Sequence, residues 1–402
     1  MKILFYNHQG KVSGAERMIL LIVKKLNRSR FEPVMVCPET DTIAAETQEL
    51  GIPCQTINQL DARFTLHLDE LLRYFASFIK TMRQLRANIR KLQPDLIHAN
   101  SIRSGLVATT ASIGIKIPVI WHLQDELPRH PLSILIRLFA VCSRRIRLMP
   151  VSRATGESFR GRIPQLLGKH LQEQVVHNGI ELEKFEIDRT NRRRIRTELD
   201  LSENELVIGI VGQITPRKGQ LELIETFART QKQMPSSTLL VVGTPIFNKD
   251  EVYLEKLKET ARDLGIENRV KFLGSRRDVA AVMQTLDLLV INSKSEALVL
   301  VAIEAMACGT PIIATAVGGT AEIIKHRKNG WLVPFGDERA LSEAIVTLSR
   351  EPEMRRLFAD ESKKYVTAHL DAEQFIKKVE SFYQLCARPA VEPTAGRLAV
   401  EN

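Results

Sequence analysis

Short apolar runs and longer segments with helical periodicity follow one another along most of the chain. Runs of a few Val, Ile and Leu residues bounded by polar residues or glycine are typical of buried strands in a parallel sheet. The longer segments repeat apolar residues every three to four positions, as one face of a helix does. This alternation predicts an α/β fold. The expected strands are residues 3–6, 33–37, 95–99, 118–123, 206–211, 238–242, 271–273, 286–291, 311–315 and 329–333.

The alternation is interrupted at residues 181–205, which are charged and poor in strand-like runs. We interpret this segment as a linker followed by a short helix. The pattern then predicts two Rossmann-like domains that face each other across a cleft, residues 1–180 and 181–371. Residues 389–402 are expected to form a loose tail. The expected helices are residues 17–26, 65–92, 250–264, 278–285, 298–308, 341–348, 354–369 and 372–387.

Two glutamates, Glu296 and Glu304, stand eight positions apart between the expected strands 286–291 and 311–315. A polar loop ends the first strand, a helix follows, and Gly309 stands where a C-cap glycine is expected. Ligands of open parallel sheets bind at the carboxyl ends of the strands, and the free N–H groups of a helix N-terminus favour a phosphate there. This stretch therefore offers a phosphate site and two acceptors for sugar hydroxyls.

The alternative interpretation is that both glutamates are solvated surface charges. Glu304 argues against it, because its neighbours Ile303 and Ala305 belong to an otherwise apolar run. A carboxylate in such a run is normally paired or hydrogen-bonded.

Two further loops follow expected strands and contain glycine. The loop GQITPRKG begins at Gly212 and carries Arg217 and Lys218, whose charges suit a diphosphate. An exposed basic turn is the alternative. The loop at residues 8–16 includes Gly14 and would let the backbone approach a phosphate, although a plain turn explains it equally well. The dinucleotide-binding pattern G-x-G-x-x-G is absent from this loop.

These motifs together resemble a known family. The chain has E-x7-E from Glu296 to Glu304, then AMACGTP from residue 305, and GGTAE from residue 318. This string resembles the donor-site signature of the retaining GT-B glycosyltransferases of family 4, and the loop before Gly219 matches the family pattern G-x-x-x-x-[RK]-K-G. Two departures stand out: Gln213 replaces a frequent arginine, and Val299 replaces a frequent glycine, which predicts a tighter sugar pocket.

The resemblance implies a role for each of these residues. Glu304 would bind the ribose hydroxyls of a nucleotide diphosphate sugar, and Glu296 the hydroxyls of the donor sugar. Arg217 and Lys218 would stabilise the leaving diphosphate, so no metal or other cofactor is expected, and the chain has no D-x-D motif. The remaining donor-binding candidates are Gly14, Gln213, Leu273 near the base, and the backbone of Leu298, Val299 and Leu300 near the phosphates and sugar.

His122 is the candidate site residue of the first half, at the end of the expected strand 118–123. In the family, a histidine at a similar W-H-x-x-D position looks into the sugar pocket. The alternative is a histidine that is satisfied by a neighbouring carboxylate, Asp125 or Glu126. The resemblance also implies that the C-terminal helix, about 372–388, crosses back to the first domain.

Charge is distributed unevenly. The net charge is +10; residues 1–180 carry 25 Lys and Arg against 14 Asp and Glu, and the remainder carries 32 against 33. The excess predicts an anionic partner for the first half. Its cations mix with apolar residues at 65–92 and, more weakly, at 133–149, which predicts contact with an anionic membrane surface or a charged acceptor, unless both segments are ordinary solvated helix faces.

Composition narrows the remaining choices. No apolar run is long enough to span a bilayer, and no signal peptide is recognised, so we expect a cytoplasmic protein that also reaches the inner membrane face. No nucleic-acid motif is present, so no nucleic-acid partner is expected. The five cysteines are scattered without metal-site spacing, and no metal site is predicted: Cys37, Cys54, Cys142, Cys308 and Cys386.

The predicted function is that of a retaining glycosyltransferase of hexosyltransferase type. It would move a sugar from UDP or GDP to a hydroxyl of a glycan or a lipid-linked acceptor, in the synthesis of cell-surface polysaccharide or glycolipid. Two alternatives stay open. One is a GT-B epimerase or hydrolase of sugar nucleotides, and the other is a non-catalytic anion-binding protein, which the departures at Gln213 and Val299 would suit.

Overall fold

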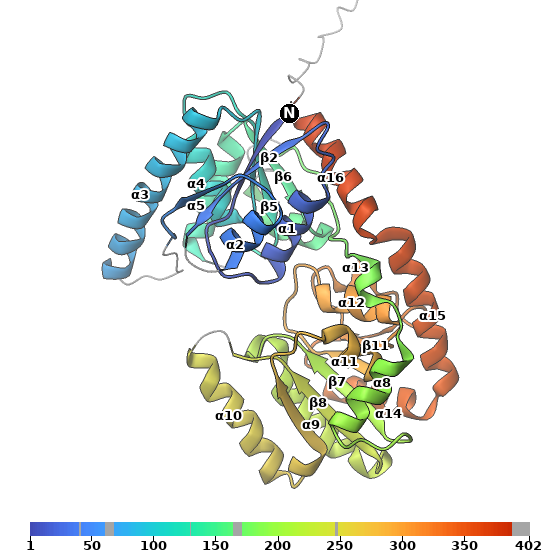
Figure 1. Ribbon diagram of the computed structural model, residues 1–402. Helices are drawn as coiled ribbons and strands as arrows, with labels where there is room; N and C mark the ends of the chain where they lie inside the picture. The colour runs from blue at the N-terminus through green and yellow to red at the C-terminus, as the bar shows by residue number, and fades with distance from the viewer. Residues whose placement is uncertain (40–41, 61–67, 129, 164–170, 246–247, 388–402) are drawn as a thin grey trace, which may run out of the picture.

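The structure is a computed structural model that describes residues 1–39, 42–60, 68–128, 130–163, 171–245 and 248–387. Two six-stranded sheets, each part of its own layered domain, make up the molecule (Figure 1). Every recorded strand pair is parallel, and helices connect the strands. The predicted α/β fold with two Rossmann-like domains is confirmed.

The first sheet has the order β3-β2-β1-β4-β5-β6. Its strands are β1 Lys2–Tyr6, β2 Glu32–Pro38, β3 Cys54–Ile57, β4 Leu96–Ala99, β5 Val119–Leu123 and β6 Ile146–Pro150. Its helices are α1 Gly14–Lys25, α2 Thr42–Glu49, α3 Leu68–Leu92, α4 Ile102–Ala111, α5 Pro131–Cys142 and α6 Arg153–Arg160.

The second sheet has the order β12-β11-β10-β7-β8-β9, the same order counted from its own first strand. Its strands are β7 Leu206–Val211, β8 Ser237–Val242, β9 Val270–Gly274, β10 Leu288–Ile291, β11 Ile312–Thr315 and β12 Trp331–Val333. Its helices are α8 Arg189–Glu198, α9 Gln220–Thr230, α10 Asn248–Asp263, α11 Val279–Thr285, α12 Leu300–Cys308, α13 Thr320–Ile323, α14 Glu338–Arg350 and α15 Pro352–His369. Short 3-10 turns are η1 Leu182–Phe185, η2 Pro216–Lys218, η3 Gln231–Gln233 and η4 Glu267–Arg269.

Each sheet separates two apolar clusters, because successive side chains of a strand point to opposite faces. In β1, Ile3 and Phe5 pack on the side of α1, whereas Leu4 and Tyr6 pack on the side that holds Trp121. Strands buried on both faces explain why the sequence shows continuous apolar runs rather than strict alternation. In both sheets the strand order reverses between the first and fourth strands, and ligands of such sheets bind at this switch point.

The last helix, α16 Ala372–Ala387, packs on the first domain although it follows the second in sequence (Figure 1). Its buried Phe375, Phe382 and Tyr383 belong to the same apolar cluster as β1 and α1. The chain therefore connects the two domains twice, before η1 and after α15. The predicted tail at 389–402 lies outside the described residues.

Two local expectations were wrong. Strand β3 was missed, because Cys-Gln-Thr-Ile carries too few apolar residues to stand out. Residues 133–149 do not form one amphipathic surface segment, since helix α5 ends at Cys142 and β6 begins at Ile146. Two of its arginines are bound to backbone of their own domain: Arg137 donates to the carbonyl oxygens of Phe159 and Ser158, and Arg145 to that of Ser112.

Candidate active site

The loops after β7 and β10 meet at the switch point of the second sheet. Lys218 Nζ lies 2.5 Å from Glu296 Oε1, and Arg217 Nη1 lies 3.5 Å from Glu296 Oε2. Arg217 also donates to the Ser295 carbonyl oxygen at 2.7 Å. Glu296 is 7% exposed. The structure thus brings three predicted site residues together, as a nearly buried carboxylate held by two cations.

Glycine permits this close approach of loops at two positions. Gly219, in the left-handed region with φ 69°, is so close to the next loop that a Cβ would lie 2.2 Å from the Asn292 carbonyl oxygen. Gly318, with φ 49°, would place a Cβ 1.7 Å from the carbonyl oxygen of Glu296. Any larger residue would push these loops apart, so the glycines of the two motifs hold Glu296 in place.

Glu304 lies in the second turn of α12 and is half-buried. Among the described residues, none forms a hydrogen bond or an ion pair with the Glu304 carboxylate. Burial raises the pKa of Glu304 to about 7, although the positive charge of Arg17 on α1 acts in the opposite direction. An unpaired carboxylate with such a pKa between two domains marks a candidate binding group.

The start of α12 corrects one expectation. Val299, the N-cap residue, is 1% exposed and belongs to the apolar core of the second domain. Its side chain therefore fills the domain interior and does not narrow a sugar pocket. Leu298 is buried beside it, and the partly buried Leu300 packs against the cores of both domains.

Gly14 lies at the start of α1, directly opposite α12. A Cβ on Gly14 would lie 3.1 Å from Leu300 Cδ1, so the two domains are in contact here. The loop before it is fixed by the buried Glu16, whose carboxylate accepts from the Ser13 N–H at 3.1 Å and from Gln9 Nε2 at 3.0 Å. This capping box starts α1 beside the second domain.

Gln213 follows β7, and Leu273 lies near the end of β9, which is separated from β7 by β8. The Gln213 side chain reaches Asp250 on α10, with 3.4 Å between Gln213 Nε2 and Asp250 Oδ2. The backbone carbonyl oxygen of Gln213 accepts from Gln220 Nε2 at 2.8 Å. Gln213 is therefore directed along its own domain. Leu273 lies at the end of β9, partly buried against the core of the second domain.

His122 lies inside the first domain with no exposed surface. Its Nδ1 is 3.1 Å from His98 Nε2, and His98 Nδ1 is 2.6 Å from the Tyr383 hydroxyl of α16. Burial, together with the neighbouring His98, holds the pKa of His122 well below its usual range. The neutral ring is thus satisfied by a histidine and by Gln124, and not by the carboxylates at Asp125 or Glu126.

Asp125 and Glu126 are the residues that sequence analysis noted only as neighbours of His122. Asp125 is exposed, and its carboxylate feels the charges of Arg217 and Glu296 from the other domain. Glu126 comes within 3.1 Å of where a Cβ of Gly318 would lie. The loop after β5 therefore faces the charged cluster.

A second cross-domain contact lies at the end of the GGTAE motif. The Glu322 carboxylate accepts from the N–H groups of Arg153 at 3.0 Å and Ala154 at 2.9 Å, at the start of α6. It also lies 2.9 Å from His177 Nε2. The Ser152 hydroxyl donates to the Ala297 carbonyl oxygen at 2.7 Å. The residue next to Glu296 is thus tied to the first domain.

No group of three or more His, Cys, Asp or Glu side chains in the described ranges is arranged to hold a metal ion. Among the helices in those ranges, none combines the length and apolar character needed to cross a membrane.

Comparison with known proteins agrees with this arrangement. Residues 191–365 match the family of glycosyl transferases group 1, and residues 13–160 match the glycosyl transferase 4-like domain. A crystal structure of Anabaena HepE in complex with UDP and glucose superposes with a TM-score of 0.79 at 26% identity, covering 96% of this chain and 99% of HepE.

Two curated relatives match parts of the chain. N-acetyl-alpha-D-glucosaminyl L-malate synthase of Bacillus anthracis is 28% identical over 58% of this chain. D-inositol 3-phosphate glycosyltransferase of Mycobacterium marinum is 38% identical over 44% of this chain. The matched segments span 59% and 37% of these relatives. The two family matches together cover most of the chain, and the fold is shared over 96% of it, so the chain belongs to the GT-B glycosyltransferases of the family 4 kind.

Proposed function

We propose that the protein transfers a sugar from a UDP-sugar to an acceptor hydroxyl with retention of configuration. The observation that carries this proposal is the cluster of Lys218, Arg217 and Glu296 at the switch point, next to the N-terminus of α12. The HepE complexes with UDP and with UDP-glucose support uridine as the nucleoside of the donor.

The proposed chemistry requires stabilisation of the charge that develops on the leaving diphosphate. Lys218 and Arg217 supply two positive charges, and the free N–H groups at the start of α12 add a partial positive charge. Glu304 accepts from the ribose hydroxyls, and Glu296 from the hydroxyls of the transferred sugar. We propose that this set acts without a metal ion.

A turnover assay tests the proposal. The protein is incubated with a panel of UDP- and GDP-sugars, with and without simple glycan and polyprenyl phosphate acceptors, and release of nucleoside diphosphate is measured. Acceptor-dependent release that is lost in Lys218→Ala supports the transferase. Rapid turnover of the donor alone would favour an epimerase or hydrolase instead, and nucleotide binding without turnover would favour a non-catalytic protein. The same assay with excess chelator tests whether metal is needed.

We further propose that the acceptor is lipid-linked and that the protein works in the cytoplasm at the inner membrane face, in polysaccharide or glycolipid synthesis. The support is the first half of α3, where Leu72 is 64% and Phe75 is 63% exposed, with Arg73 between them. Helix α5, which packs against the same apolar cluster as α3, exposes Ile134 and Leu135. Exposed apolar groups beside cations suit an anionic bilayer.

Co-sedimentation with anionic vesicles at moderate and high salt tests this surface. We expect binding at moderate salt that is weakened in Phe75→Asp and unchanged in Leu357→Asp, a matched change at an exposed leucine of the second domain. Absence of binding to anionic vesicles would exclude the membrane and leave the transferase proposal intact.

A further inference from the structure

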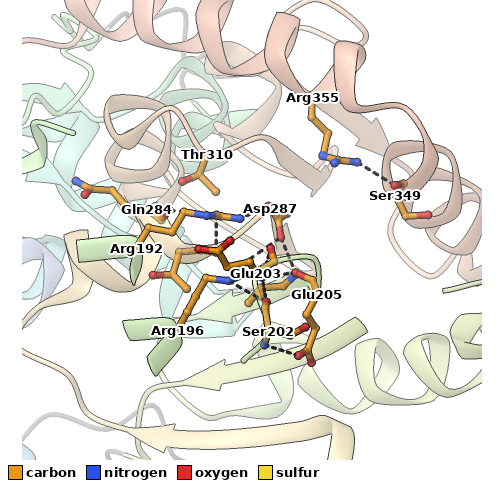
Figure 2. A network of polar contacts seen from close by, with 12 residues as sticks. Arg192, Arg196, Ser202, Glu203, Glu205, Gln284, Asp287, Thr310, Ser349 and Arg355 are labelled. Atoms are coloured by element: carbon orange, nitrogen blue, oxygen red, sulfur yellow. Dashed lines mark hydrogen bonds and ion pairs between the residues drawn. The ribbon is translucent and has the colours of Figure 1, made fainter. Parts of the chain in front are cut away.

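A pocket opens at the edge of the second sheet opposite the candidate active site. Its volume is about 310 Å³, and it lies between the starts of β10 and β11, helix α8 and the first turns of α15. Figure 2 shows the polar network at its wall, in which Arg192 is directed toward Asp287 below Thr310, while Arg355 is directed toward Ser349. The polar lining residues are Arg192, Gln284, Asp287, Thr310, Arg355 and Arg356.

The one carboxylate among these lining residues is already occupied. Asp287 Oδ1 accepts from Arg192 Nη2 at 2.8 Å, and Asp287 Oδ2 accepts from the Val207 N–H at 2.8 Å. The nearly buried Arg196 lies behind it, and its Nη1 is 3.9 Å from Asp287 Oδ2. This Nη1 has no hydrogen-bond partner among the described residues, whereas Nη2 donates to the carbonyl oxygens of Ser202 and Glu205. Asp287 therefore serves two arginines and one backbone group and has little capacity left.

Arg355 has donors that this network does not use. Its Nη1 donates to the carbonyl oxygens of Leu348 and Ser349, at 3.0 Å for the latter. Among the described residues, no acceptor lies within hydrogen-bond distance of its Nη2 or Nε. Arg356 beside it is largely exposed and pairs with Glu353 at the surface. Two guanidinium groups thus border the pocket with donors available to a ligand.

The charges around the pocket reinforce one another. Burial lowers the pKa of Arg355, and the positive charges of Arg192 and Arg356 act in the same direction, while Asp287 opposes them. Arg355 still stays protonated at neutral pH, because guanidinium groups ionise far above it. The pocket therefore has an excess of positive charge that its own carboxylate does not balance.

We propose that this pocket binds a phosphate group, either as inorganic phosphate or as a small phosphate ester. The planar guanidinium group of arginine matches phosphate oxygens in geometry and charge. A wall lined by several arginines therefore suits a phosphate ligand better than a ligand with one carboxylate. The volume accommodates the phosphate together with a small alcohol. The site is separate from the donor site, because α12 lies between them, with Leu300 at the donor end and Cys308 at the pocket.

Phosphate titration at constant ionic strength tests the site, with sodium chloride as the reference salt and thermal stability or calorimetry as the readout. A ligand that binds the folded state raises its stability by mass action. We expect phosphate-specific binding in the wild type that persists in Lys218→Ala, where the candidate donor site is impaired. Arg355→Gln should weaken this binding about tenfold, since a charge-assisted hydrogen bond is lost.

Two further variants keep the test independent of folding. Arg356→Gln changes a largely exposed side chain and should weaken phosphate about threefold, whereas Arg350→Gln, a matched change on the exposed end of α14, should have no effect. Tighter binding of glycerol 3-phosphate than of phosphate would identify an ester as the ligand, and the reverse would identify the free ion. No phosphate effect beyond chloride, or equal binding in Arg355→Gln and wild type, would overturn the proposal. Because the readout does not use UDP, this result is independent of the proposed transferase activity.

Discussion

Replacing Glu304 by glutamine should stabilise the fold at neutral pH while it weakens nucleotide binding. Burial raises the pKa of Glu304 from 4.5 to about 7. An acid with a raised folded-state pKa disfavours folding once the unfolded chain has ionised. The cost is absent below pH 4.5, grows as pH rises toward 7, and is complete above that. At about 1.36 kcal/mol per pKa unit, it approaches about 3 kcal/mol at pH 8.

Urea unfolding of the wild type and of Glu304→Gln at several pH values measures this cost. The free energies of unfolding should agree near pH 4.5 and separate progressively as pH rises, with the variant more stable. Calorimetric titration with UDP at pH 8 should show the opposite order, because the ribose hydroxyls lose an ionised acceptor worth about 1.5–3 kcal/mol. The control is Glu251→Gln, an exposed helical glutamate of α10, which should change neither quantity.

Two results would refute the reasoning about Glu304. Equal stability of Glu304→Gln and wild type at pH 8 would mean that the carboxylate is better solvated or paired than its surroundings indicate. Unchanged UDP affinity in a folded variant would remove Glu304 from the nucleotide site. A gain in stability with a loss of binding would show that a costly carboxylate is retained for a ligand.

Three further changes test the site and its supports. Lys218→Ala should lower turnover about 100- to 1,000-fold at saturating donor, and Lys218→Arg should restore part of it, as measured by diphosphate release; near-normal turnover would exclude the role. Glu322→Gln should lower the free energy of unfolding by about 1–3 kcal/mol at pH 7, because the ionised carboxylate binds two N–H groups and His177. This difference should vanish as pH falls through the lowered pKa of Glu322. The control is Glu343→Gln, which changes an exposed ion pair. Gly318→Ala should destabilise far more than Gly336→Ala, which has a similar positive φ but open space around it, and unfolding midpoints that coincide would contradict the close approach to Glu296.

Sequence patterns predicted the fold well because both sheets are buried on both faces. Continuous apolar runs such as residues 206–211 indicate buried parallel strands. The loops that follow parallel strands lie at the same edge of the sheet. The contact of Lys218 with Glu296 follows from this topology, since β7 and β10 are neighbours at the switch point.

Other features depend on side-chain direction, which spacing alone does not specify. Val299 was expected to narrow a pocket, but its side chain fills the core, since the N-cap residue of α12 turns inward. His122 was expected to meet a ligand or a carboxylate, but it contacts the buried His98. His98 in turn contacts Tyr383, which lies 285 residues further along the chain. Contacts between such distant segments leave no local signal.

The two glutamates of the E-x7-E motif have opposite electrostatic surroundings, and this bears on how a donor could enter. Glu296 is neutralised by Lys218 and Arg217, whereas Glu304 has no partner among the described residues. In the donor complex that we propose, the diphosphate competes with Glu296 for Lys218, and the ribose hydroxyls donate to the unpaired Glu304. Binding then exchanges one ion pair for another and adds hydrogen bonds to a carboxylate that has none. The net gain arises at Glu304, while the cations are kept aligned by Glu296 until the diphosphate arrives.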